Sequence, residues 1–233
     1  MSTNRENNSL SANVIYDLTS FTHLDYQDHL SCIVWFSGCN MRCDYCYNKD
    51  IVFAKDGKFS YRDILDFLKT RVNLLEAVVL SGGEASSHEL VPFCLKIKEL
   101  GFKIKLDTNG TNFANVKELI ELNLLDYIAL DYKAPKAKFT QITHSNKFDE
   151  FSKTLDFLIK QNFDFEARTT LHSDLLDYND INEIMSDLTE RGYAKEYYIQ
   201  EFVETDSNIG DLKSPKNAFN KAFLKSDLKI IFR

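Results

Sequence analysis

The sequence predicts an α/β fold in which parallel strands form a sheet that helices cover. Short apolar runs rich in Val, Ile, Phe and Tyr alternate along the chain with longer stretches whose apolar residues recur with helical periodicity. The runs are mostly apolar, which is typical of strands buried on both faces of a parallel sheet. An open doubly wound sheet and a sheet curled into a partial barrel both fit this pattern, and periodicity does not separate them.

Six segments are predicted to be strands because they are short, apolar and rich in β-branched and aromatic residues. In chain order they are residues 30–36, 77–80, 102–106, 127–130, 164–170 and 197–202. Stretches with apolar residues on one face are predicted to be helices, and these are residues 61–71, 89–100, 115–123, 148–161 and 180–191. Gly101 and Gly192 follow two of these helices, as expected for C-terminal caps. The last stretch, 208–233, mixes turn residues with the apolar residues 230–232, a candidate for one more strand.

The composition is that of an ordinary globular protein, with 44% hydrophobic and 27% charged residues among 233. Residues 1–13 are polar and lack periodicity, so we expect a mobile tail there. No repeat and no Pro/Gly-rich linker interrupts the remainder, and the chain has only three prolines. The simplest interpretation is a single domain that spans residues 14–233.

The net charge of -7 and the lack of a dense basic run argue against a nucleic-acid partner, because phosphate backbones favour clustered Lys and Arg. No apolar stretch reaches the ~18 residues of a membrane-spanning helix, and the first residues lack the apolar core of a signal peptide. These features predict a cytoplasmic protein that does not bind a membrane. Thiols stay reduced in the cytoplasm, so the five cysteines are candidates for metal binding or catalysis before disulfides.

Three of the cysteines follow the first predicted strand with the spacing C-x-x-x-C-x-x-C, at Cys39, Cys43 and Cys46. Soft thiolates favour iron–sulfur clusters or zinc, and three thiolates without a fourth suit a 4Fe–4S cluster with one open iron. The alternatives are a zinc site completed by His29 or His88, or three unrelated buried cysteines.

Ligands of parallel α/β folds gather at the carboxyl ends of strands, so the residues directly after each strand are informative. Gly82, Gly83 and Glu84 follow the second predicted strand. A glycine pair lets a ligand approach the backbone closely, and a neighbouring carboxylate can hold an ammonium group. A plain turn explains the same residues equally well.

The third and fourth predicted strands are each followed by an aspartate. Asp107 and Thr108 follow the third strand, and Asp131 and Lys133 follow the fourth. Two carboxylates at one rim suit a hard cation or hydroxyl groups, and the lysine suits a ligand carboxylate. The alternatives are an Asx-turn or helix cap at Asp107 and a solvated surface lysine.

Two further polar residues lie on the later strands. Arg168 is a charge in an otherwise apolar strand, which requires a salt bridge or an anionic ligand. Gln200 ends the next strand and is ambiguous in the same way, since it suits either a structural partner or a ligand.

Six motifs occur in this order: SGCNMRCDYCYN, LSGGE, GFKIKLDTNG, DYIALDYKAP, FEARTTLH and YYIQEF. Together they resemble the radical S-adenosylmethionine superfamily, more narrowly the activating enzymes of glycyl-radical proteins, and most closely the anaerobic ribonucleoside-triphosphate reductase activating proteins. This resemblance implies a partial (β/α)6 barrel of the TIM type, with the active site at the carboxyl ends of the strands.

The resemblance also implies roles for the cysteine loop. Cys39, Cys43 and Cys46 would ligate a 4Fe–4S cluster. Tyr45 would lie near the adenine of S-adenosylmethionine, and Asn48 would order the loop and its bound cofactor.

For the strand ends, the resemblance implies that the Gly-Gly-Glu segment holds the methionine amino group. Asp107, Thr108 and Asp131 would form a monovalent-cation and cofactor site, and Lys133 would contact the cofactor carboxylate as the catalytic lysine. Two further strand residues would contact the cofactor: Arg168 and Gln200.

The implied reaction is reductive cleavage of S-adenosylmethionine to methionine and a 5'-deoxyadenosyl radical, which takes a hydrogen atom from a glycine of a partner enzyme. The partner would be anaerobic ribonucleoside-triphosphate reductase, and the electron donor a low-potential protein such as flavodoxin or ferredoxin.

Three positions depart from the usual family pattern, namely Ala85, Tyr47 and Tyr132, and these departures weaken inference about the substrate. The competing interpretations are a small-molecule radical enzyme of the 7-carboxy-7-deazaguanine synthase type and a non-enzymatic zinc or iron–sulfur module.

Overall fold

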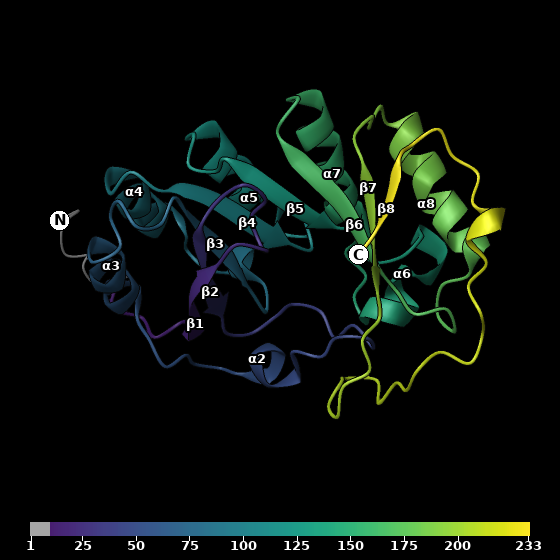
Figure 1. Ribbon diagram of the computed structural model, residues 1–233, viewed down its shortest axis with the longest axis horizontal. Coiled ribbons are helices and arrows are strands. Elements are labelled where there is room, and N and C mark those ends of the chain that lie inside the picture. The colour runs from purple at the N-terminus through teal and green to yellow at the C-terminus, as the bar shows by residue number, and fades with distance from the viewer. Residues whose placement is uncertain (1–9) are drawn as a thin grey trace. The chain divides into compact units, whose positions relative to one another are not determined.

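The computed structural model describes residues 10–233 (Figure 1). Contacts within the chain divide it into two compact units. The first unit contains the described residues up to Asn40, Asp50–Thr108 and Asn112–Ile128, and the second contains Met41–Lys49, Asn109–Thr111 and Ala129–Arg233. Most of the predicted tail, residues 1–9, lies outside the described residues, and the single domain over 14–233 stays a prediction.

The first unit is built on four strands: β1 (Ile15–Thr22), β2 (Ser31–Phe36), β3 (Ala77–Gly82) and β4 (Lys103–Thr108). Strands β2, β3 and β4 are parallel neighbours, and β1 runs antiparallel to β2. Its helical elements are α3 (Tyr61–Lys69), η1 (Ala85–Ser87), α4 (Val91–Glu99) and α5 (Phe113–Glu121). Parallel neighbours need crossover connections, and the helices α3 and α4 provide them.

The second unit contains three parallel strands: β6 (Phe165–Leu171), β7 (Tyr197–Glu201) and β8 (Ile230–Phe232). Its helical elements are α6 (Lys136–Thr143), α7 (Phe148–Lys160), α8 (Tyr178–Glu190) and η2 (Lys221–Phe223). Two elements span the boundary between the units: α2 (Lys49–Phe53) and β5 (Tyr127–Asp131).

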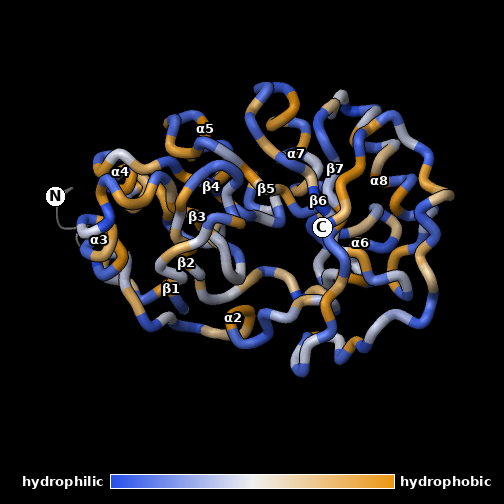
Figure 2. Tube along the Cα trace, viewed as in Figure 1, coloured by the Kyte–Doolittle hydropathy of each residue, from blue (hydrophilic) through white to orange (hydrophobic). Residues whose placement is uncertain are grey.

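The sequence explains where the longer helices start and which face they bury. Ser60 caps α3 and Asp177 caps α8, each through a capping box with an aspartate three residues later. Helices α3, α7 and α8 are amphipathic, and Figure 2 shows hydrophobic and hydrophilic residues interspersed along them. The middle of β2 and of β3 is almost wholly buried, as expected for parallel strands.

The predicted element order is confirmed. The six predicted strands are β2 to β7, the candidate strand at 230–232 is β8, and the five predicted helices are α3, α4, α5, α7 and α8. Strand β1 was not predicted, because most of its residues are exposed or half-buried and only its two ends are buried, as expected for a strand with a single partner. Helices α2 and α6 were not predicted either. Helix α2 has only five residues, and α6 is weakly amphipathic and lacks a side-chain cap. No helix among the described residues is long and apolar enough to cross a membrane.

Candidate functional site

The first unit places the Gly-Gly-Glu segment against the chain that leads into Cys39. The amide of Gly83 donates to the carbonyl of Phe36 at 2.9 Å, and the amide of Glu84 donates to that of Gly38 at 2.9 Å. A side chain at Gly83 would overlap the Gly38 carbonyl, and Gly82 has a φ of +113°. Both glycines are therefore required for close approach of two backbone segments.

Glu84 is buried, and its carboxylate is held within the first unit. The oxygen Oε1 accepts hydrogen bonds from the hydroxyl of Ser86 at 2.6 Å and from that of Thr108 at 2.7 Å. Glu84 also caps the short helix η1 through the Ser86 amide. The structure thus brings together the predicted residues Glu84 and Thr108, which lie 24 positions apart in the sequence.

His88 provides a second contact to the same backbone, and sequence reasoning gave it only as a zinc-ligand alternative. Its Nε2 lies 2.8 Å from the carbonyl oxygen of Ser37, and its ring packs on Phe36 with 5.3 Å between centroids. Burial lowers the pKa of His88, although the Ser37 carbonyl opposes the shift. The neutral imidazole therefore donates to the residue that begins the cysteine loop.

Asp107 lies at the end of β4 with two partners in the first unit. The hydroxyl of Ser81 donates to Oδ2 at 3.2 Å, and the ammonium of Lys105 lies 3.4 Å from Oδ1. Lys105 was not predicted as a site residue, although its position two residues before Asp107 places both on one face of the strand. Asn109 forms an Asx-type contact, because its side chain accepts from the amide of Thr111.

The second unit contains two of the three motif cysteines, Cys43 and Cys46, on one turn. The amide of Cys46 donates to the carbonyl of Cys43 at 3.0 Å, and both are free thiols. Tyr45 between them is 4% exposed, and its hydroxyl makes no hydrogen bond within the described part of the chain. Burial raises the pKa of the Cys43 thiol to about 11, while the ammonium of Lys133 opposes the rise.

The end of α6 holds one side of this cysteine turn. The amide of Arg42 donates to the carbonyl of Thr143 at 2.9 Å, and the amide of Asp44 donates to that of Ile142 at 3.1 Å. The carboxylate of Asp44 also lies 2.7 Å from Nε2 of His144. The turn is therefore fixed through its own backbone by a helix about 100 positions away.

Residues 208–210 hold the other side of the turn. The amide of Ile209 donates to the carbonyl of Cys46 at 3.1 Å, and that of Gly210 donates to the carbonyl of Asp44 at 2.8 Å. Asn208 is 2% exposed and exchanges two hydrogen bonds with the backbone of Leu212, which orders this segment. No pattern in the sequence marked these residues.

Three charged residues of the second unit form an ion-pair network. Asp131 accepts from Lys133 at 2.9 Å and from Nε of Arg168 at 2.6 Å. Burial opposes ionisation of Asp131, but the two cations outweigh it and lower its pKa to about 2. Burial also works against the charge of Lys133, yet Asp131 and Tyr45 raise its pKa well above the usual value. The Lys133 ammonium lies 5.8 Å from the Tyr45 ring centroid.

Two predicted residues have fewer defining contacts. Asn48 is half-buried at the end of the cysteine loop. Gln200 is half-buried on β7 beside Thr170 of β6. Their predicted roles stay predictions.

Ten of the predicted residues therefore form two groups, one in each unit. Gly82, Gly83, Glu84 and Thr108 lie together in the first unit. The second group consists of Cys43, Cys46, Tyr45, Asp131, Lys133 and Arg168. The cysteines are divided, since Cys39 belongs to the first unit. Among the described residues, no three His, Cys, Asp or Glu side chains are gathered to hold a metal ion.

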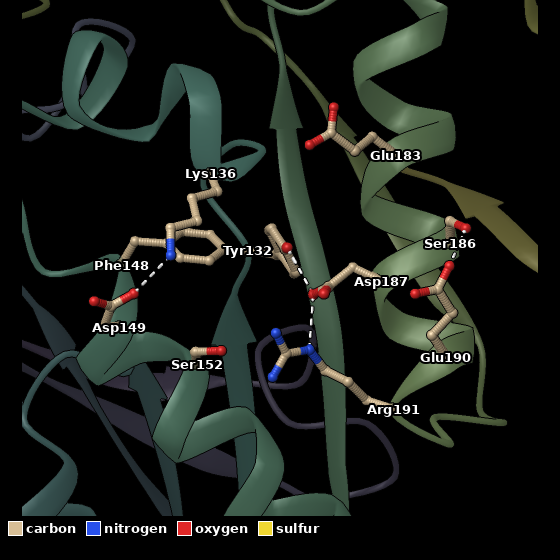
Figure 3. A pocket seen from close by; sticks show the side chains of 10 residues that line it. All are labelled: Tyr132, Lys136, Phe148, Asp149, Ser152, Glu183, Ser186, Asp187, Glu190 and Arg191. Atoms are coloured by element: carbon tan, nitrogen blue, oxygen red, sulfur yellow. Dashed lines mark hydrogen bonds and ion pairs between the residues drawn. The ribbon is translucent and has the colours of Figure 1, made fainter.

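A cavity of about 340 Å³ lies in the second unit and contains none of the predicted site residues. Its walls come from α7, α8 and the start of α6, with Tyr132 beside them (Figure 3). Asp187 accepts from the Tyr132 hydroxyl at 2.8 Å and from Arg191 at 2.9 Å, as the dashed lines in Figure 3 show. The Tyr132 hydroxyl and the Arg191 guanidinium thus both donate to one carboxylate of the cavity wall.

Comparison with known proteins identifies the family. The model of the radical SAM superfamily matches residues 33–188, which is more than half of the chain. A candidate glycyl-radical enzyme activating enzyme of Methanocaldococcus jannaschii is 28% identical over 222 residues, covering 91% of this chain and 85% of that protein. The pyruvate formate-lyase-activating enzyme of Streptococcus mutans is 29% identical over 130 residues, or 49% of each chain. The 7-carboxy-7-deazaguanine synthase of Aquifex aeolicus is 24% identical over 59% of each chain.

Solved structures identify the fold. The Streptococcus suis protein SuiB, crystallised with S-adenosylmethionine, matches with a TM-score of 0.65 and 14% identity. The match covers 86% of this chain and 49% of SuiB, so the chain spans about half the length of that protein. It spans about half of the Streptococcus mutans enzyme as well. The likeness confirms the predicted α/β fold, with parallel strands in an open, partial barrel.

The order of the motifs, the close approach of the Gly-Gly-Glu segment and the family match agree with one another. This chain therefore belongs to the radical SAM superfamily of enzymes.

Proposed function

We propose that this protein activates a glycyl-radical enzyme by removing a hydrogen atom from a glycine of that partner. The observation that carries the proposal is the buried network in which Lys133 is held by Asp131 beside Tyr45 and the cysteine turn. Similarity to the Methanocaldococcus jannaschii protein over 91% of the chain supports it. When bound, the cluster and S-adenosylmethionine supply the electron and the 5'-deoxyadenosyl radical for this reaction.

The cysteines suit a 4Fe–4S cluster by the chemistry of their donor set. Cys39, Cys43 and Cys46 form no disulfide among the described residues, and soft thiolates are the usual ligands of iron–sulfur clusters. Cys43 and Cys46 lie on a turn whose backbone is hydrogen-bonded on two sides. These three residues would hold the cluster, and the fixed turn would limit rearrangement when it loads.

The residues that would hold S-adenosylmethionine come from both groups. Gly82, Gly83 and Glu84 would receive the amino group, because the backbone carbonyls of this segment and the Glu84 carboxylate are acceptors for an ammonium group. Lys133 would bind the carboxylate with its ammonium. Four residues would complete the cofactor contacts: Tyr45, Asn48, Arg168 and Gln200.

The protein's own contribution is binding, orientation and exclusion of water. Asp131 keeps Lys133 charged and directs its ammonium, so a carboxylate would meet a fixed donor. Tyr45 is buried and would offer its ring to a base by stacking. We expect these groups to set the orientation of the bound cofactor.

The partner that we propose is anaerobic ribonucleoside-triphosphate reductase, with flavodoxin or ferredoxin as electron donor in the cytoplasm. The motif resemblance supports this choice, and the similarity to the activating enzymes supports a glycyl-radical partner in general. A small-molecule reaction of the 7-carboxy-7-deazaguanine synthase type is the second candidate, supported by similarity over 59% of the chain. The Asp107 and Asp131 motifs favour the activating enzyme.

The test is anaerobic. The protein is reconstituted with iron and sulfide, and its visible and electron paramagnetic resonance spectra are recorded with and without S-adenosylmethionine. We expect a 4Fe–4S signal that S-adenosylmethionine perturbs, formation of 5'-deoxyadenosine, and a glycyl radical when the reductase is added. Binding of colourless zinc alone, without cleavage, would contradict the proposal.

A matched pair of variants tests the cluster ligands. Cys43→Ala should lose the cluster and cleavage, because one of the three thiolates is gone. Cys94→Ala removes an equally buried thiol on α4, outside the cysteine loop, and should keep both. Radical formation on the reductase would favour the activating enzyme, whereas turnover of a small-molecule substrate without it would favour the second candidate.

A further inference from the structure

Lys105 and Asp107 form a buried ion pair on β4. The two residues are separated by one position, so both project from the same face of the strand. Their side chains are 7% and 14% exposed, and Nζ of Lys105 lies 3.4 Å from Oδ1 of Asp107. Buried charges are stable when each has an opposite charge and hydrogen-bonding partners. Asp107 thus has a permanent positive neighbour within its own unit.

The surroundings of Lys105 fix its ammonium in this position. It donates to the backbone carbonyl of Asp25 and lies 5.9 Å from the ring centroid of Tyr127. The loop that carries Asp25 is itself held, since the hydroxyl of Thr22 donates to the Asp25 carboxylate at 2.6 Å. A carbonyl dipole, an aromatic face and a carboxylate therefore stabilise one cation.

The second carboxylate of the expected monovalent-cation site is also paired with cations of the protein. In the second unit, Asp131 accepts from Lys133 and from Arg168. Each aspartate is thus neutralised by side chains of its own unit. A metal ion bound to the Asp107 carboxylate would lie close to the Lys105 ammonium, and like charges at such a distance repel in a buried site. The residues present do not fit an additional monovalent cation.

We propose that the ammonium of Lys105 takes the place of a monovalent metal ion at Asp107, so that this protein requires no such ion. The proposal deepens the proposed function, on which it depends for the role of Asp107 beside the cofactor. The ion pair itself does not depend on that role. Lys105 is a positioning residue, because it acts through the Asp107 carboxylate.

The experiment compares potassium chloride with choline chloride at equal ionic strength, using the anaerobically reconstituted protein. The first measurement is the melting temperature, and the second is the affinity for S-adenosylmethionine by calorimetry. For the unaltered protein we expect both to agree between the two salts. An ion that binds the folded protein raises the melting temperature in a saturable way, so this comparison detects it directly.

The variant Lys105→Met removes the charge and keeps the length of the side chain. We expect its melting temperature in choline chloride to fall, and potassium to recover about 3 °C or more, because the Asp107 carboxylate then lacks the Lys105 cation and a metal ion can take its place. Lys105→Arg keeps a cation and should stay insensitive to potassium. Lys103→Met is the control, since Lys103 lies on the same strand, is exposed and contacts His29 instead.

A saturable rise in the melting temperature or the affinity of the unaltered protein with potassium would overturn the proposal. It would also be overturned by a folded Lys105→Met variant that gains no potassium dependence. If that variant does not fold, the unaltered protein and Lys105→Arg decide the question by their response to potassium. Loss of S-adenosylmethionine binding in every salt would reject the proposed function, while the melting temperatures still test the ion pair.

Discussion

The two halves of the candidate site are held in different ways. In the first unit, the Gly-Gly-Glu segment contacts the neighbouring strand end, and parallel strand pairing brings these segments together. In the second unit, the cysteine turn contacts α6 and residues 208–210, which lie about 100 and 160 positions further along the chain. The first arrangement depends on adjacent strands and glycine, and the second on remote backbone contacts. Substitutions in the first unit should therefore act mainly on stability, and those in the second on both stability and cofactor binding.

The largest effect is expected for Gly83→Ala in the first unit. The new methyl group would overlap the carbonyl of Gly38, and neither backbone can move without breaking the hydrogen bonds around it. We expect a loss of about 3 kcal/mol in the free energy of unfolding, measured by urea denaturation of the apoprotein. Gly101→Ala is the control, because nothing lies within 4 Å of a methyl group there. That variant should lose only about 1 kcal/mol, owing to its φ of +89°.

In the second unit, Asp131→Asn tests the ion-pair network. The pKa of Asp131 is lowered from 3.8 to about 2, so its ionised form stabilises the folded protein above pH 3.8. This stabilisation, ~2 kcal/mol, is lost as the pH falls through about 2. We expect the variant to show a flatter loss of stability between pH 4 and pH 2, and weaker binding of S-adenosylmethionine at pH 7. Unchanged affinity with an intact cluster would reject the cofactor role of Asp131.

A smaller effect is expected for Gly210→Ala, which tests residues 208–210 as a support of the cysteine turn. The methyl group would lie 2.7 Å from Cβ of Asp44, closer than real Cβ atoms approach, so one of the two segments must shift. We expect a loss of about 1 kcal/mol in stability and a lower iron content after reconstitution. Asp206→Ala, an exposed change in the same segment, is the control. Full iron content in Gly210→Ala would show that the turn does not depend on this contact.

The sequence predicted the parts of the molecule that local chemistry determines. The apolar runs of β2 to β7 and the glycines at 82 and 83 carry their structural reason in the residue types themselves. The aspartates at strand ends were also found, because parallel strands align their carboxyl ends at one edge.

The parts that sequence reasoning missed depend on contacts between remote segments. Lys105 would be taken for a surface lysine unless its contacts with Asp107 on the same strand and with the Asp25 loop are known. Residues 208–210 have no periodicity, and their amides become informative only when the cysteine turn lies against them. A charged residue two positions before a strand-end aspartate was a signal that could have identified Lys105.

The smallest effect on stability is expected for His88→Gln. This variant sharpens the comparison of the two units, because it changes a side-chain contact of the first unit without disturbing its strand pairing. The glutamine amide can replace Nε2 as donor to the Ser37 carbonyl, so stability at pH 7.5 should change by less than about 1 kcal/mol. Burial lowers the pKa of His88 below its usual 6.5, so the unfolded chain binds a proton at a higher pH than the folded one. The unaltered protein should therefore lose stability as the pH falls below 6.5, towards the pKa of the folded state. Urea denaturation between pH 7.5 and pH 5.5 should show a weaker pH dependence for His88→Gln, because glutamine does not titrate. Equal slopes for the two proteins would mean that protonation of His88 makes no contribution, and that its contact with Ser37 survives in the charged state.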